Sequence, residues 1–233
     1  MSLKKIVALL VVGFMFSSAI AQDEVSVQNL KREGSLAYKE KKYDEALAKF
    51  EEAIKASAAA GEEDMAAVYK AGMASYKGKK FDKSIGFFNK LVEKNSKKCK
   101  AYSYLANIYK KQENRDMQLE VLKKGSEECV AQKGKFDKKL AKAYLKSGAN
   151  MYNAGAKVQA SVATLKTTDA KYIKAMDKAN KEFKAAQTDL EQSYAINPKN
   201  KTLLKMLATV YTNLEMKSKA AKMEAELKAV TKK

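Results

Sequence analysis

The sequence predicts an all-α protein, an α-solenoid of about five stacked helix pairs, and three observations lead to this fold class. The composition favours helices, because the 233 residues include one Pro and ten Gly and are 46% apolar. Apolar residues recur at three- and four-residue steps, which places them on one face of a helix. A common framework of small and aromatic residues then returns along the chain, as expected when one hairpin cannot bury its apolar face alone.

Residues 1–21 have the features of a secretory signal peptide. Lys4 and Lys5 form a positive start, an apolar run follows, and a small-x-small cleavage site ends at Ala21. We expect cleavage after Ala21 and a mature chain, residues 22–233, that is periplasmic or secreted. The alternative is an uncleaved membrane anchor, but the apolar run is shorter than the ~20 residues that a membrane span needs.

The first helix pair defines the framework of the repeat. Gly34 and Ala46 are small positions where two helix backbones approach, and the ring of Phe50 fills the space beside them. Gly72 and Phe88 repeat this arrangement 38 residues later. A mid-helix Gly costs about 1 kcal/mol relative to Ala, so its return indicates close packing. The same pattern, more degenerate further on, predicts helix pairs at residues 27–60, 65–97, 99–129, 136–198 and 201–230.

The fourth pair is elongated by an insertion at about residues 156–181. Apolar residues step by four and three up to Leu165 and again from Tyr172, on either side of the polar turn 166–169. We expect one antiparallel hairpin with a coiled-coil-like seam, whose helices of ~28 residues project roughly 20 Å beyond the stack. The alternative is a flexible insertion, because Gly155 and the β-branched residues after it are mediocre helix formers.

The charge of the chain is large and uneven. The formal charge of +19 becomes +17 when Lys4 and Lys5 are removed with the signal peptide. Residues 31–64 contain seven bases and nine acids (net −2), whereas residues 77–111 contain eleven Lys and two acids (net +9). The basic region would attract anionic lipid, cell-wall glycan or acidic protein; the alternative is a solubilising surface. We expect no nucleic-acid partner for an exported, Lys-rich chain, and only peripheral membrane contact, if any.

Catalytic constellations are absent from the sequence. The chain has no His, which excludes Ser–His–Asp and Cys–His catalysis and any histidine metal site. Its neighbouring Glu pairs point to different helix faces, and no phosphate-binding Gly loop or metal-ligand spacing occurs. We therefore expect no enzyme, no cofactor and no metal. Cys99 and Cys129 lie at adjoining ends of the third pair and are a disulfide candidate; two reduced thiols are the alternative.

The framework resembles the tetratricopeptide repeat over nearly all of the mature chain. The resemblance rests on Gly34, Tyr43, Ala46, Phe50, Ala53 and the closing Asn197-Pro198. It implies a right-handed superhelix whose concave groove is lined by the first helix of each pair and binds protein segments. Exported proteins of this length and type resemble those of Bacteroidetes-type bacteria.

The resemblance also implies which residues line the groove. Carried over residue by residue, they are Lys31, Tyr38, Tyr69, Met73, Tyr76, Lys100, Tyr104, Asn107, Lys142 and Tyr152. A groove rich in Tyr and Lys suits an extended acidic or aromatic segment. For Tyr38, Tyr76 and Tyr152 the alternative role is packing within or between repeats. We expect a non-catalytic protein-binding scaffold, with envelope attachment as the alternative and self-association through the long hairpin as a further possibility.

Overall fold

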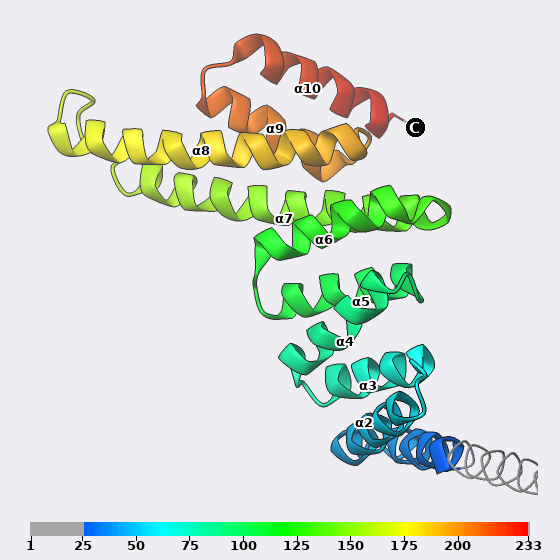
Figure 1. Ribbon diagram of the computed structural model, residues 1–233. Helices are drawn as coiled ribbons and strands as arrows, with labels where there is room; N and C mark the ends of the chain where they lie inside the picture. The colour runs from blue at the N-terminus through cyan, green and yellow to red at the C-terminus, as the bar shows by residue number, and fades with distance from the viewer. Residues whose placement is uncertain (1–25, 233) are drawn as a thin grey trace, which may run out of the picture. The chain divides into compact units, whose positions relative to one another are not determined.

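The computed structural model describes residues 26–232, which form only helices and the turns between them (Figure 1). This confirms the all-α prediction. A helix over residues 26–39 comes first. The following elements are α2 Tyr43–Ala59, α3 Met65–Lys77, α4 Phe81–Glu93, α5 Lys98–Lys111, α6 Arg115–Glu128, the 3₁₀ helix η1 Val130–Gln132, α7 Lys133–Ala160, α8 Ala170–Ile196, α9 Lys201–Asn213 and α10 Lys217–Thr231.

The chain divides into two compact units. Unit 1 ends at Val121 and unit 2 begins at Leu122, so the division falls inside α6. Unit 1 contains the helix 26–39 and α2 to α5, and unit 2 contains α7 to α10. Consecutive helices pack on one another within each unit, α2 on α3 and α3 on α4 in the first, α7 on α8 and α8 on α9 in the second.

Close approach of paired helices explains the recurring glycines in unit 1. A Cβ at Gly34 would lie 2.8 Å from Cε1 of Phe50, a ring that is only 1% exposed. A Cβ at Gly72 would lie 3.1 Å from Cε1 of Phe88, which is fully buried. Ser84 stands where the first pair has Ala46, and its hydroxyl donates a 2.9 Å hydrogen bond to the carbonyl of Gly72. The packing predicted from the glycine and ring spacing is confirmed.

The corner inside each of the four shorter helix pairs contains one residue in the left-handed region, which the sequence did not reveal. Lys41 and Lys79 have φ values of 63° and 61°, and Glu113 and Glu215 both have φ of 57°. None of these residues is Gly, the type that adopts positive φ without steric cost. The backbone N–H one residue later turns back to the preceding helix, as Lys42 N does to the carbonyl of Ala37 at 2.9 Å.

Ion pairs within unit 1 explain the uneven charge of the sequence. Acids of residues 31–64 meet lysines of the basic region 77–111, so the two stretches neutralise one another in part. The pairs are Lys80 with Asp44 at 2.9 Å, Lys83 with Glu51 at 2.7 Å, and Lys90 and Lys94 with Glu63 at 3.2 and 2.7 Å. Four of the eleven lysines are therefore committed to acids of the same unit.

Unit 2 contains the two longest helices of the described chain. α7 has 28 residues and α8 has 27, and they form an antiparallel pair. A Cβ at Gly155 would lie 2.8 Å from Cε1 of Phe183, and one at Gly148 2.7 Å from Cγ of Leu190, so the helices approach closely along the seam. The turn between them covers residues 161–169, longer than the predicted 166–169, and Asp169 caps α8 by accepting a 2.7 Å hydrogen bond from Lys171 N.

The start of α7 corrects a second boundary. The sequence placed the start of the fourth pair at residue 136, but η1 and then α7 occupy residues 130–135. The ammonium of Lys133 donates to Ser126 Oγ at 3.1 Å and to Asp137 Oδ2 at 2.8 Å, and Ser126 also donates to Asp137. These bonds join the end of α6 to the first turns of α7, which lets the helix begin earlier than its local sequence suggests.

The helices α9 and α10 cover only one end of the long hairpin. Ala186 and Leu190 of α8 belong to the same buried cluster as Leu204 and Leu207 of α9, whereas no residue between 153 and 185 does. In Figure 1, α8 accordingly continues past α9 toward the turn.

A polar network joins α8, α9 and α10 beside this cluster. Glu191 accepts hydrogen bonds from Tyr211 at 2.8 Å, Gln187 at 2.9 Å and Lys219 at 3.3 Å. Burial opposes ionisation of Glu191, but these donors prevail and hold its pKa below the ordinary value.

Two expectations concern membranes. The predicted signal peptide, residues 1–21, lies outside the described residues. Within residues 26–232, no helix combines the length and the apolar character that a bilayer crossing requires.

Candidate functional site

Four of the predicted groove tyrosines come together in unit 1. Tyr38 lies on the helix 26–39, Tyr69 and Tyr76 on α3, and Tyr104 on α5. The ring centroid of Tyr104 is 6.2 Å from that of Tyr69 and 5.4 Å from that of Tyr76, both in edge-to-face geometry. Tyr104 is close enough to Tyr38 to contribute to the raised pKa of Tyr38. We call Tyr38, Tyr69, Tyr76 and Tyr104 the tyrosine face.

Rings from the second helix of the first two pairs pack against the tyrosine face. Phe88 of α4 is fully buried and stacks on Tyr104, with centroids 4.7 Å apart and planes 6° from parallel. The four tyrosines themselves are only half-buried. They therefore take part in the packing between pairs, which was the alternative for Tyr38 and Tyr76, and still present part of each side chain to solvent. Aromatic pairs of this kind add about 0.5–1.5 kcal/mol beyond their buried area.

The hydroxyls of Tyr38 and Tyr69 remain protonated far above neutral pH. The pKa of Tyr69 is raised to about 12, mainly by burial. The charge of Tyr104 and a hydrogen bond to Tyr104 contribute less. Burial also raises the pKa of Tyr38, with smaller contributions from Tyr104 and Tyr43. At neutral pH these groups are uncharged and can donate hydrogen bonds to carbonyl or carboxylate oxygens.

Two lysines lie beside Tyr69 of the tyrosine face, and a third lies nearby on α3. The Lys97 and Lys100 ammoniums lie 5.5 and 5.9 Å from the ring centroid of Tyr69. The Lys70 ammonium is 5.6 Å from the ring of Phe50 and donates to Ser35 Oγ at 2.9 Å. A cation within about 6 Å of a ring centroid is attracted to the ring face. The site thus combines hydroxyl donors, aromatic surface and positive charge.

Lys31 has a different role from the other predicted lysines. Its ammonium lies 2.5 Å from Oδ2 of Asp64, the N-cap of α3, which also accepts a 2.9 Å bond from Ala67 N. Burial of Asp64 opposes its ionisation, but the bonds from Lys31 and Ala67 prevail and lower its pKa. Lys31 therefore joins the first two helix pairs, and its charge is already balanced.

The remaining predicted site residues are more dispersed. Met73 is half-buried on α3 and Asn107 is exposed on α5, so both lie on helices that contribute tyrosines. Lys142 and Tyr152 belong to α7 in unit 2, where Lys142 is exposed and Tyr152 packs 5.8 Å from the ring of Phe183. Sequence reasoning missed Lys97, because it precedes α5 in a turn and the repeat framework marks only helix positions.

The predicted disulfide involves residues of both units. Neither Cys99 nor Cys129 is a free thiol in the structure, and Cys129 is 3% exposed. Because Cys99 belongs to unit 1 and Cys129 to unit 2, their pairing with each other stays a prediction. Mass spectrometry of the non-reduced protein after digestion tests it. Closing a loop of about 30 residues would stabilise the fold by roughly 3–4 kcal/mol, which reductant would remove.

Comparisons with known proteins concern the fold. No family model matches the chain, and no curated protein sequence matches it. Among solved structures, the chain is similar to a tetratricopeptide-repeat protein of Bacteroides fragilis, at 22% identity over 80% of this chain and 98% of that one, with a TM-score of 0.48.

Two further solved structures have lower identity. One is the protein MamA of AMB-1, at 13% identity over 90% of this chain and 93% of that one, with a TM-score of 0.47. The other is YrrB, described as a tetratricopeptide-repeat protein with an unusual peptide-binding site. It has 14% identity over 92% of this chain and 91% of that one, with a TM-score of 0.45.

Proposed function

We propose that this protein is a non-catalytic scaffold that binds a protein segment on the tyrosine face, outside the cytoplasm and after loss of residues 1–21. The observation that carries the proposal is the convergence of Tyr38, Tyr69, Tyr76 and Tyr104 from three different helices. Rigid tyrosine rings offer large contact area at low entropic cost, which is why they are enriched in binding surfaces.

The chemistry of the tyrosine face favours an acidic segment. Lys97 and Lys100 supply positive charge beside Tyr69, and neither forms an ion pair in the described part of the chain. Neutral hydroxyls can bind backbone carbonyls along an extended segment, while the lysines attract its carboxylates. Binding of this kind needs only the hydroxyls, rings and charges of these tyrosines and lysines, and no catalytic group.

Envelope attachment through the basic region 77–111 is the weaker candidate. Four of its lysines are neutralised by Asp44, Glu51 and Glu63, which reduces the free charge available to anionic lipid or glycan. Charge-driven attachment would also fade with added salt.

The test compares two exposed asparagines of unit 1. A photoreactive amino acid is placed at Asn107, on the same helix as Tyr104, or at Asn89 on α4 as the matched control. The partner that is captured in the native envelope is then identified, and its affinity for the purified full chain is measured. We expect capture from position 107 only, and loss of at least about tenfold in affinity for Tyr69→Ala/Tyr104→Ala.

Two results contradict the proposal. One is equal capture from both positions. The other is unchanged affinity of the double variant at unchanged helicity, measured by circular dichroism. The location is tested separately: the envelope fraction should contain a chain whose mass begins at Gln22.

A further inference from the structure

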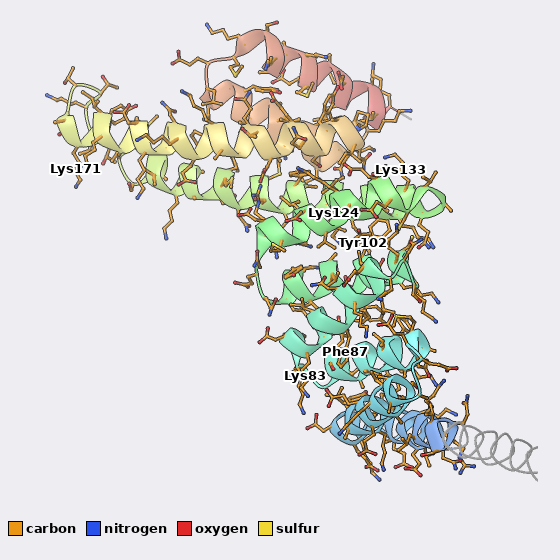
Figure 2. All side chains as sticks on the ribbon, viewed as in Figure 1. Lys83, Phe87, Tyr102, Lys124, Lys133 and Lys171 are labelled. Atoms are coloured by element: carbon orange, nitrogen blue, oxygen red, sulfur yellow. The ribbon has the colours of Figure 1, made fainter. Side chains whose placement is uncertain are left out.

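The end of the long hairpin that α9 leaves uncovered differs from the rest of unit 2. We call residues 154–182 the distal hairpin; they follow Tyr152 on α7 and precede Phe183 on α8. The cluster shared with α9 includes Met151, Tyr152 and Ala186 but no residue of the distal hairpin. Figure 2 shows Lys171 at the turn end of α8, away from α9. Ile173, one of the three most exposed large apolar side chains of the described residues, lies there at 51% exposure.

The charges of the distal hairpin are unpaired. It contains six Lys (157, 166, 171, 174, 178 and 181) and three acids (Asp169, Asp177 and Glu182), a net charge of +6 − 3 = +3. Within residues 26–232, none of these nine side chains makes an ion pair, whereas lysines of unit 1 and of α10 do. The positive field of this segment is therefore available to a partner.

A groove lies between the two helices on this segment. Its volume is about 430 Å³, and it is lined by Ala154, Lys157, Val158 and Ser161 from the α7 side and by Lys178 and Glu182 from α8. Ala154 and Val158 are one helical turn apart and form the apolar part of this lining. Both lysines of the lining are basic neighbours of this apolar surface, Lys157 from α7 and Lys178 from α8.

We propose that this groove is a second docking site, independent of the tyrosine face, for an acidic protein segment. An apolar side chain of the segment rests on Ala154 and Val158, and its carboxylates pair with Lys157 and Lys178. A second copy of this chain would bring another distal hairpin of charge +3 against the first, which is repulsive. A flat anionic membrane fits less well, because Glu182 in the lining of the groove would repel a continuous negative surface.

The test measures fluorescence anisotropy of a labelled peptide of Glu-Glu-Leu-Ala repeats with the purified full chain. A peptide of Lys-Lys-Leu-Ala repeats is the charge-inverted control. The test variant is Lys157→Glu/Lys178→Glu, and the matched variant is Lys166→Glu/Lys184→Glu, the same charge change on exposed residues outside the groove. We expect binding of the acidic peptide only, weakened about tenfold or more by the groove variant and less than about twofold by the matched variant.

Four results decide the outcome. A photoreactive amino acid at Ser161 should crosslink to the acidic peptide. Equal weakening by both charge-reversal variants shows non-specific attraction and overturns the proposal. Loss of peptide binding in Tyr69→Ala/Tyr104→Ala but not in the groove variant places the peptide on the tyrosine face and overturns it as well. Co-sedimentation with vesicles of equal parts phosphatidylglycerol and phosphatidylcholine that requires Lys157 and Lys178, without peptide binding, assigns the groove to a membrane instead.

Discussion

Replacing glycines of unit 1 by alanine should give opposite results at two positions. Gly86 lies in α4 with nothing within 4 Å of its missing Cβ, so Gly86→Ala gains helix propensity alone, about 1 kcal/mol of stability. Gly34→Ala gains the same propensity, but its Cβ falls 2.8, 3.0 and 3.1 Å from three atoms of the Phe50 ring. That ring is 1% exposed, so it cannot swing out into solvent to make room. Overpacking of this kind costs about 1–3 kcal/mol.

The two variants should therefore differ by about 1–3 kcal/mol in the free energy of unfolding, with Gly34→Ala the less stable. Urea unfolding followed by far-ultraviolet circular dichroism measures the difference. Gly34→Ala should cost less stability in a Phe50→Leu background than in the wild type, because the smaller Leu side chain leaves room for the new methyl group. Equal stabilisation by Gly34→Ala and Gly86→Ala would show that close helix approach does not require glycine here.

Three further predictions concern polar groups. Asp64→Ala should lower the free energy of unfolding by about 1–2 kcal/mol, because it removes the α3 cap and the Lys31 pair. The pKa of Asp64 is lowered in the fold, so its stabilisation is present above the unfolded pKa of about 4 and is lost as pH falls through the folded pKa. Urea unfolding at a series of acidic pH values should therefore show that the free energy of unfolding falls less steeply with pH in the variant than in the wild type. The pKa of Tyr69 is raised to about 12, so its stabilisation is complete below the unfolded pKa of about 10 and is lost as pH rises to about 12. In Tyr69→Phe, the free energy of unfolding should fall less steeply between these two pH values. The ultraviolet absorbance of the variant should also lack one phenol that ionises late. Among residues 26–232, Asn180 Oδ1 is buried and has no hydrogen-bond partner, so Asn180→Leu should raise the melting temperature. A lower melting temperature would indicate an ordered water at that oxygen.

Helix pairing was predictable because it depends on short-range spacing. Gly34 and Phe50 are separated by a fixed number of residues within one hairpin, so their contact can be read from the sequence alone. The seam of the long hairpin has the same local origin, and the ~28 residues expected for each helix compare with 28 in α7 and 27 in α8. The family resemblance also placed Tyr69, Tyr76 and Tyr104 on helices whose side chains meet.

The pairing of charges was not predictable, because it depends on contacts between different helix pairs. Lys31 was expected to face a partner, yet it meets Asp64, 33 residues later. Lys83 likewise finds Glu51, 32 residues earlier. The early start of α7 has the same cause, since Lys133 is held by Ser126 of the preceding helix. A repeat pattern fixes which face a lysine occupies, whereas its counter-ion depends on the register between neighbouring hairpins.

Because α9 covers only one end of the long hairpin, the length of the hairpin can change without affecting the stability of the covered end. Each heptad inserted on both sides of the turn would move the tip outward by about 10 Å while leaving Ala186, Leu190 and their α9 neighbours in place. Reach is therefore an adjustable property of this protein, and variants with shorter or longer arms should retain the same base.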